Sequence, residues 1–325
     1  MARAQTLVRL VIALGVALLV AAAAAGWFVW KRPLLVDALF SRLALSRAGL
    51  AASVIEAPTG DLTVWSGGAD GPTVVLLHGA GDQAGAWARV VPGLTGRFRV
   101  VIPDLPGHFK SDPAQGPLSV GMMLDAVEAT VDACCPEERV TLVGNSLGAW
   151  LAFLVAHEQP ERVDRVVAVN GGPVVATDTT VNLFPRTREE ARETMRALTG
   201  PDTPEIPGNV LDAVARNMRE GPAARLAETA GEMGRYLLEG RLDEVRVPVA
   251  LVWGESDELF TPAYARRLEE SLPAAELFLV ERCGHVPHRE CPGRFLEQLN
   301  RALAAPIEAE PEAPEAPAAA EEVPT

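Results

Sequence analysis

Basic side chains are scarce in this 325-residue chain, which has 29 Lys and Arg against 43 Asp and Glu and a net charge of −14 at pH 7. The deficit of basic relative to acidic side chains lies mainly in the centre of the chain. Residues 1–50 carry +5 and the six Glu after Pro306 carry −6, which leaves −13 on the part between them. A surface of that sign repels phosphate backbones and anionic headgroups. The charge balance therefore excludes a nucleic-acid partner, and any membrane contact must come from the N-terminal segment.

Cysteine is rare as well. Cys134 and Cys135 are adjacent, whereas Cys283 and Cys291 stand on either side of His285. Four cysteines in so long a chain neither require nor exclude a disulfide. Cysteine content therefore does not decide in which redox compartment the protein works.

Only one long apolar run is present, the 21 uncharged residues 10–30, and its length is about that needed to cross the hydrocarbon core as a helix. The basic and aromatic residues around it are typical of a membrane interface: Arg3, Arg9, Trp27, Trp30, Lys31 and Arg32. We predict residues 1–32 to be a transmembrane anchor. The small residues Ala21–Ala25 leave a cleavable signal peptide as the alternative.

The orientation of this anchor in an inner membrane of bacterial type follows less directly. Lys31, Arg32, Arg42 and Arg47 outnumber the two arginines on the N-terminal side, which favours a cytoplasmic body. The very short N-terminal flank and the signal-like core favour the opposite side. We take an extracytoplasmic body as the working expectation.

Residues 33–50 form a candidate amphipathic linker helix that begins at Pro33 and ends at Gly49. Leu35, Leu39 and Leu43 share one face, and Arg42 and Arg47 are available for lipid headgroups. The helix could lie on the membrane surface or on the body. At the other end of the chain, residues 306–325 are almost all Ala, Pro and Glu, which cannot form a core and predict a disordered tail.

Residues 51–305 contain short Val-rich runs alternating with helical stretches, which predicts one α/β domain. The runs have no polar alternation, as expected of a parallel sheet covered on both faces. They occupy residues 74–77, 100–102, 140–143, 166–169, 249–253 and 277–280.

The strongest motif is Gly144-Asn145-Ser146-Leu147-Gly148, which follows the run 140–143 and precedes a helical stretch. A strand, Gly-x-Ser-x-Gly, helix order is typical of a nucleophile elbow. The turn needs Gly144 and Gly148 because larger side chains would collide with the neighbouring strand and helix. The hydroxyl of Ser146 is pushed out of the core, beside free N–H groups that favour an oxyanion. We predict Ser146 as a nucleophile.

A serine nucleophile needs a base and an acid that orients the base. Asp257 stands just after one strand-like run, and His285 stands on a loop after the next one. We predict Asp257 as the acid and His285 as the base. Glu255 and His288 are the alternatives, whereas His108 and His157 are interpreted as structural.

An oxyanion hole is predicted from main-chain N–H groups at two places. The run 74–77 leads into His78-Gly79-Ala80-Gly81, where the N–H of Ala80 is the expected donor. The second donor is the N–H of Leu147, directly after the nucleophile. His78 and Gly79 are expected to support the loop, and His78 is not expected to titrate in catalysis.

Together these segments resemble the α/β-hydrolase superfamily over roughly residues 55–303. The resemblance rests on His78-Gly79-Ala80-Gly81 with Trp87, Pro103–His108 with Ser111, Gly144–Gly148, Trp253–Asp257, and Gly284-His285 with Pro287 and Glu290. It implies the α/β-hydrolase fold, the chain order Ser146, Asp257, His285 and a helical cap at about residues 173–246. Candidate lining residues of that cap are Phe184, Met195, Met218, Met233 and Tyr236, although for any single one of them packing of the cap's own helices is the favoured interpretation. Phe109 departs from the pattern, because relatives usually carry Gly there.

The sequence thus predicts a membrane-anchored serine hydrolase of the lipase or esterase type, acting on a small-molecule or lipid acyl ester without a metal or organic cofactor. Epoxide hydrolases and haloalkane dehalogenases of this superfamily use Asp, so Ser146 argues against both. Asn145 is similar to its counterpart in bacterial lipases and in hydrolases of carbon–carbon bonds, so a hydrolase of ring-fission products is one alternative. A binding protein that kept the fold and lost the chemistry is another. Chain-length preference and oligomeric state are left open.

Overall fold

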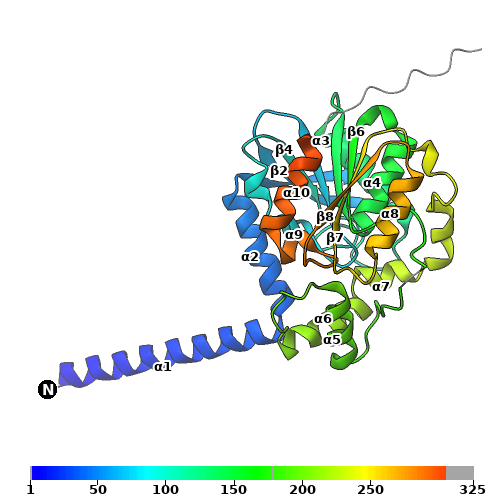
Figure 1. Cartoon of the computed structure of the whole chain (residues 1–325). Coiled ribbons are helices and arrows are strands. Elements are labelled where there is room, and N and C mark those ends of the chain that lie inside the picture. Colours follow the sequence, from blue (N-terminus) through cyan, green and yellow to red (C-terminus); the bar gives the residue numbers. More distant parts are fainter. Residues whose placement is uncertain (1, 178, 305–325) are drawn as a thin grey trace, which may run out of the picture.

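The computed structural model describes residues 2–177 and 179–304, and its centre is an eight-stranded sheet in the order β1-β2-β4-β3-β5-β6-β7-β8 (Figure 1). The strands are β1 (Leu50–Ala57), β2 (Gly60–Gly68), β3 (Thr73–Leu77), β4 (Arg99–Pro103), β5 (Val140–Asn145), β6 (Val163–Val169), β7 (Val249–Gly254) and β8 (Ala275–Val280). β2 is antiparallel to both β1 and β4, and all other neighbours are parallel. The predicted mostly parallel sheet is confirmed, and its six predicted runs are β3 to β8. The antiparallel edge strands β1 and β2 were not predicted.

The described residues also form ten α-helices and five short 3₁₀ helices. The α-helices are α1 (Ala2–Lys31), α2 (Pro33–Arg47), α3 (Val120–Cys134), α4 (Leu147–Glu158), α5 (Arg188–Leu198), α6 (Gly208–Glu220), α7 (Pro222–Ala227), α8 (Pro262–Ser271), α9 (Pro287–Glu290) and α10 (Pro292–Ala304). The 3₁₀ helices are η1 (Ala84–Trp87), η2 (Val91–Gly93), η3 (Pro160–Arg162), η4 (Ala230–Tyr236) and η5 (Leu242–Glu244). Hydroxyl side chains at the caps fix several starts: Ser119, Thr187 and Thr261 accept from backbone N–H groups of α3, α5 and α8.

Both faces of the sheet are covered, which explains the unbroken apolar strands. Along β3, Val75 and Leu77 face a core built with α3, α4 and α8. Val74 and Leu76 face the other core, to which α2, η1 and α10 contribute. Since successive side chains of a strand point to opposite faces, every position of β3 must be apolar or small to avoid an unpaired polar group.

Helix α1 extends away from the body and no part of its apolar window is buried (Figure 1). The stretch Gln5–Lys31 has 27 residues and is long and apolar enough to cross a membrane, by length and composition. An N-terminal signal sequence has the same properties. The predicted disordered tail at 306–325 lies outside the described residues.

Helix α2 packs on the body through Ala38, Arg42 and Leu45, which are buried and stand three or four residues apart on one helix face. The Nη2 atom of Arg42 lies 2.7 and 2.6 Å from the two carboxylate oxygens of Asp104. The expectation that Arg42 meets lipid headgroups is therefore wrong, because its position in the helix turns it into the core. The opposite face remains exposed and apolar, with Leu35, Leu39, Phe40 and Leu43.

Phe109 completes the surroundings of Arg42. Its ring centroid lies 3.4 Å from the guanidinium carbon of Arg42, and its backbone has a positive φ of 51°. Glycine adopts such a conformation at no steric cost, whereas a residue with a Cβ is strained there. In this chain the strain of a left-handed Phe is offset by the contact between its ring and the guanidinium. Phe109, which departs from the family pattern, thus helps to hold α2 on the body through Arg42.

We expect Arg42→Met to lower the free energy of unfolding by about 3–5 kcal/mol, because the carboxylate of Asp104 would remain buried without its partner. Urea unfolding of the detergent-solubilised chain measures this. The matched control is Arg47→Met, which removes an exposed arginine from the last turn of the same helix and should change stability by less than about 0.5 kcal/mol. Equal losses in the two variants would contradict the structural role of the buried pair.

The segment predicted as a cap lies between β6 and β7 and contains α5, α6, α7 and η4. Ala191, Leu211 and Ala215 form a small core between α5 and α6, and Met195 packs against it. Met233 and Tyr236 pack against the main core, so they serve as packing residues. In Figure 1, α5 and α6 lie at the end of the molecule where α1 joins α2.

Candidate active site

Ser146 stands on the turn between β5 and α4 with φ 54° and ψ −115°. Its N–H donates to the carbonyl of Val169 on β6, at 3.0 Å. A Cβ on Gly144 would overlap the carbonyl oxygen of Gly148, and one on Gly148 would overlap the carbonyl oxygen of Leu77. The turn can therefore form only with glycine at both positions, and it holds a non-glycine residue in a strained conformation that is typical of functional sites.

Asp257 and His285 come together from the loops after β7 and β8. The Nδ1 atom of His285 lies 2.8 Å from Oδ2 of Asp257, and both residues are almost fully buried. With Nδ1–H donating to the carboxylate, Nε2 of the ring is left as the acceptor that a general base needs. The N–H groups of Leu259 and Phe260 donate to the other carboxylate oxygen, at 2.8 and 3.2 Å. The carboxylate is thus fixed in one orientation.

Two asparagines that the sequence analysis did not assign to the site hold this arrangement together. Asn145 donates through Nδ2 to the carbonyls of Val169, at 3.1 Å, and His285, at 2.9 Å, so it ties the His285 loop to the turn that carries Ser146. Asn170 donates to Oδ2 of Asp257 at 2.8 Å and accepts from the N–H of Gly254 at 3.1 Å. A signal for Asn170 was present, since it directly follows a parallel strand and such strand ends gather at one edge of a sheet.

The segments that carry both predicted oxyanion donors lie next to Ser146. Leu147 is the first residue of α4, so its N–H has no acceptor within the helix. Ala80 is exposed on the loop after β3. A Cβ on neighbouring Gly79 would lie 3.3 Å from Cβ of Ser146, so this loop runs directly beside Ser146. The positive end of the α4 dipole adds to the attraction for an anion at this point.

Two buried histidines hold the loop that carries Ala80. In His78, Nδ1–H donates to the carbonyl of Gly79 at 2.8 Å, and Nε2 accepts from the N–H of Leu105 at 3.0 Å. In His108, Nε2 accepts from the N–H of Gly81 at 2.9 Å. Burial lowers the pKa of His78 to about 4 and that of His108 to about 3. Both rings are neutral at pH 7 and act as fixed pairs of one donor and one acceptor.

The alternatives from the sequence lie elsewhere. Glu255 is exposed, and Asp257 carries the hydrogen bond to His285. His288 is buried with its ring centroid 4.2 Å from that of Trp87, and neither ring nitrogen has a hydrogen-bond partner among the described residues. His157 lies near the surface, 2.7 Å from a carboxylate oxygen of Glu244.

The His285 loop is closed by a disulfide between Cys283 and Cys291, which the cysteine spacing had left open. Cys134 and Cys135 are free. Glu290 lies close to both bridged sulfurs, but sulfurs joined in a disulfide are not available as thiolate ligands. The loop also touches the cap segment, since the N–H of His285 donates to the carbonyl of Leu198 at the end of α5, at 2.9 Å.

The histidines that hold the loop predict a pH dependence of stability. Their pKa values are about 4 and 3 in the folded protein against 6.5 in an unfolded chain, so below pH 6.5 the unfolded state binds protons that the folded state does not. We expect the free energy of unfolding to fall as the pH is lowered from 6.5 to about 4, with up to about 1.4 kcal/mol per pH unit from each ring. His108→Gln should reduce the slope of unfolding free energy against pH by the contribution of one ring, up to about 1.4 kcal/mol per pH unit. A stability that stays constant over this range, measured by urea unfolding, would contradict the prediction.

Comparison with known proteins agrees with this geometry. Residues 74–298 match the alpha/beta hydrolase family, which is more than half of the chain. The chain belongs to the alpha/beta hydrolase family. The matched range includes Ser146, Asp257 and His285, together with the loops that hold them.

The proteins to which this alpha/beta hydrolase is similar catalyse several different reactions. The crystal structure of a membrane phospholipase A superposes with a TM-score of 0.72 at 26% identity, and the alignment covers 90% of this chain and 99% of that one. A pimeloyl-[acyl-carrier protein] methyl ester esterase of Aromatoleum aromaticum is 29% identical over 66% of this chain and 92% of its own length. A 2-hydroxy-6-oxononadienedioate/2-hydroxy-6-oxononatrienedioate hydrolase of Cupriavidus pinatubonensis is also 29% identical, over 67% of this chain and 82% of its own length. Hydrolase activity is the property that these relatives share.

Proposed function

We propose that this alpha/beta hydrolase cleaves carboxylic esters of acyl chains through an acyl-enzyme. Ser146 Oγ attacks the ester carbonyl while His285 Nε2 takes its proton, and Asp257 holds the imidazolium that forms. The N–H groups of Ala80 and Leu147 stabilise the negative oxygen of the tetrahedral intermediate. His285 then gives the proton to the leaving alcohol, and water releases the acid from Ser146 by the same steps.

The observation that carries the proposal is the strained Ser146 turn beside the hydrogen-bonded pair of His285 and Asp257. Asn145 connects the two parts, since it precedes the nucleophile and donates to the carbonyl of His285 at 2.9 Å. A nucleophile, a base and an acid that orients the base are the parts that acyl transfer requires. No step in this sequence calls on a metal or an organic cofactor.

The N-terminal region favours a lipid as the acyl ester substrate. Helix α1 is long and apolar enough to cross a membrane, and α2 exposes Leu35, Leu39, Phe40 and Leu43 next to it. We propose that α1 is retained as an anchor and that this face of α2 lies in the interface. The structural similarity to a membrane phospholipase A over 90% of the chain supports the same substrate class.

We further propose that the catalytic body lies on the extracytoplasmic side of the membrane. The support is the disulfide between Cys283 and Cys291, because disulfides persist in oxidising compartments and are rare in the cytosol. Its position on the His285 loop makes the redox state of the compartment relevant to the site. Alkylation of free thiols in intact cells, followed by mass spectrometry of these two cysteines, tests on which side of the membrane the catalytic body lies.

Hydrolysis of a carbon–carbon bond is the second candidate, favoured by 29% identity to the Cupriavidus hydrolase. Asn145 does not separate the two candidates. Its amide is used inside the protein by Val169 and His285, so either kind of substrate could be served by it.

The deciding experiment compares p-nitrophenyl esters of short and long acyl chains with a ring-fission product, using the full chain in detergent. We expect turnover of the esters, with an optimum at a medium or long chain, and labelling of the enzyme by a fluorophosphonate. Turnover of the ring-fission product alone would transfer the proposal to the carbon–carbon hydrolase. A folded protein that neither turns over a substrate nor is labelled would indicate a binding role.

A further inference from the structure

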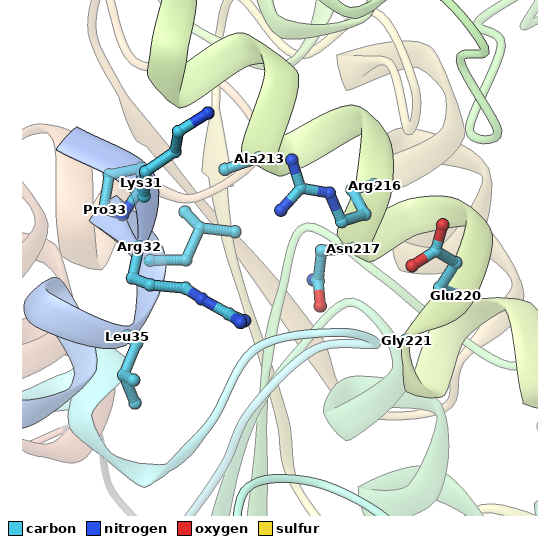
Figure 2. Close-up of a pocket in the computed structure, with 10 residues that line it drawn as sticks. Lys31, Arg32, Pro33, Leu35, Ala213, Arg216, Asn217, Glu220 and Gly221 are labelled. Atoms are coloured by element: carbon cyan, nitrogen blue, oxygen red, sulfur yellow. The ribbon is translucent and has the colours of Figure 1, made fainter. Parts of the chain in front are cut away.

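A cavity of about 230 Å³ lies between the joint of α1 and α2 and the cap helix α6 (Figure 2). The α1–α2 side contributes Lys31, Arg32, Pro33, Leu34 and Leu35, and the α6 side contributes Ala213, Arg216, Asn217, Glu220 and Gly221. Figure 2 shows Arg32 and Arg216 on opposite sides of this cavity. Segments almost two hundred residues apart in the sequence thus border one open cavity.

The cavity lies where the apolar part of α1 ends. Lys31 is the last residue of α1, and Asn209 at the start of α6 donates to the carbonyl of Trp30 at 3.1 Å. Trp and Lys or Arg at the end of an apolar helix mark the boundary between hydrocarbon and water. With α1 in a membrane, the cavity would open at the level of the lipid headgroups.

Its lining is basic in a protein whose body is acidic. Lys31, Arg32 and Arg216 line the cavity with Glu220 as the single acid, whereas the body as a whole carries −13. Guanidinium groups bind phosphate oxygens through two parallel hydrogen bonds, and each basic residue near an anionic membrane surface adds to the attraction. A phosphate is the headgroup that matches this set of side chains.

The cavity is connected to the nucleophile through Asn217. Its Nδ2 donates to the carbonyl of Gly81 at 3.1 Å, on the loop that carries the oxyanion donor Ala80. The same loop passes Ser146 at Gly79. In a glycerophospholipid the phosphate and the nearest ester carbonyl are separated by only a few bonds, so a lipid seated by its phosphate presents its ester to this loop.

We propose that this cavity is a subsite for the phosphate of a glycerophospholipid drawn from the membrane in which α1 is anchored. The proposal rests on the ester hydrolysis proposed above and narrows its substrate from acyl esters in general to phospholipids. The phosphate lies between Arg32 and Arg216, and the acyl ester points toward Ser146. No new bond is formed in the subsite, which acts by raising affinity and by orienting the ester.

The test compares two lipids with the same acyl chains, a dioctanoyl phosphatidylglycerol and a dioctanoylglycerol, in mixed micelles with the full-length enzyme. The variant is Arg32→Gln with Arg216→Gln, one arginine from each side, and Lys31 is kept to preserve the end of the anchor. We expect the ratio of kcat/KM for phospholipid over diacylglycerol to fall about tenfold, equivalent to about 1.4 kcal/mol. The loss should lie mainly in KM, because the arginines are not at the reacting atoms.

The matched control is Arg246→Gln with Arg266→Gln, which removes the same charge from exposed positions that do not line the cavity. It should keep the ratio of the parent enzyme. An unchanged ratio in the cavity variant, or an equal fall in the control, would overturn the subsite. Competitive inhibition by millimolar glycerol 3-phosphate would overturn the lipid source, since the subsite would then take soluble phosphates. A parent enzyme that hydrolyses neither lipid nor p-nitrophenyl esters would instead overturn the proposed function.

Discussion

Replacing Ser146 by alanine is expected to abolish ester hydrolysis, with a fall in kcat of about 10⁶-fold. The hydroxyl is the atom that forms the acyl-enzyme, and an alanine methyl group cannot act as a nucleophile in its place. Alanine fits the turn at least as well as serine, since the strain at φ 54° belongs to the backbone and to any residue with a Cβ. The loss should therefore be chemical, with the free energy of unfolding kept or slightly raised.

Initial rates on a p-nitrophenyl ester, with circular dichroism and urea unfolding beside them, separate chemistry from folding. Ser256→Ala is the matched control, because this serine stands on the loop after β7 and, among the described residues, forms a hydrogen bond only through its backbone N–H, which donates to the carbonyl oxygen of Cys283. It should retain the activity of the parent enzyme. Retention of most activity in Ser146→Ala would rule out the acyl-enzyme mechanism. So would fluorophosphonate labelling that persists without Ser146.

The second large effect is expected from Asp257→Asn, which should lower kcat by about 10⁴-fold. Oδ2 of Asp257 accepts from His285 Nδ1 at 2.8 Å and from Asn170 Nδ2 at 2.8 Å. An asparagine can satisfy both only with its oxygen at that position. If its amide nitrogen faces the ring instead, Nδ1 must accept, Nε2 then carries the proton, and His285 can no longer take a proton from Ser146.

Glu255→Gln provides the matched control for this substitution, since it makes the same chemical change two residues away on an exposed side chain. We expect its rate to stay within about twofold of the parent, in line with an exposed substitution far from the reacting atoms. Rates on one p-nitrophenyl ester across the pH range measure both variants. A large loss in Glu255→Gln together with an active Asp257→Asn would assign the acid to the rival residue.

The contact between the His285 loop and the cap segment gives these kinetics a structural context. The N–H of His285 donates to Leu198 at the end of α5, and Glu290 accepts from Gly200 and Thr203 beyond it. His285, the proposed base, is thus supported by the predicted cap segment as well as by Asn145 at the end of β5. These contacts would explain a lower kcat in variants of residues 198–203, even if those residues do not contact the substrate.

The sequence alone was sufficient to predict the features that depend on residues close together in the chain. The strands β3 to β8 were readable because a strand buried on both faces must be apolar throughout. The elbow was readable because the turn at Ser146 needs glycine at Gly144 and Gly148, which is a local steric requirement. Ser146, Asp257 and His285 were found by their places after the runs that became β5, β7 and β8, and the structure adds the hydrogen bond between the last two.

Tertiary structure alone decided which distant residues meet. Arg42 was expected at the lipid headgroups, but its position on α2 buries it against Asp104, 62 residues away. Asn170 became part of the site only because β6 lies next to β7 in the sheet. The basic cavity exists because α6 of the cap meets the end of α1. Periodicity and turn sterics are properties of short segments, whereas such contacts depend on the packing of whole elements, which no short stretch of sequence encodes.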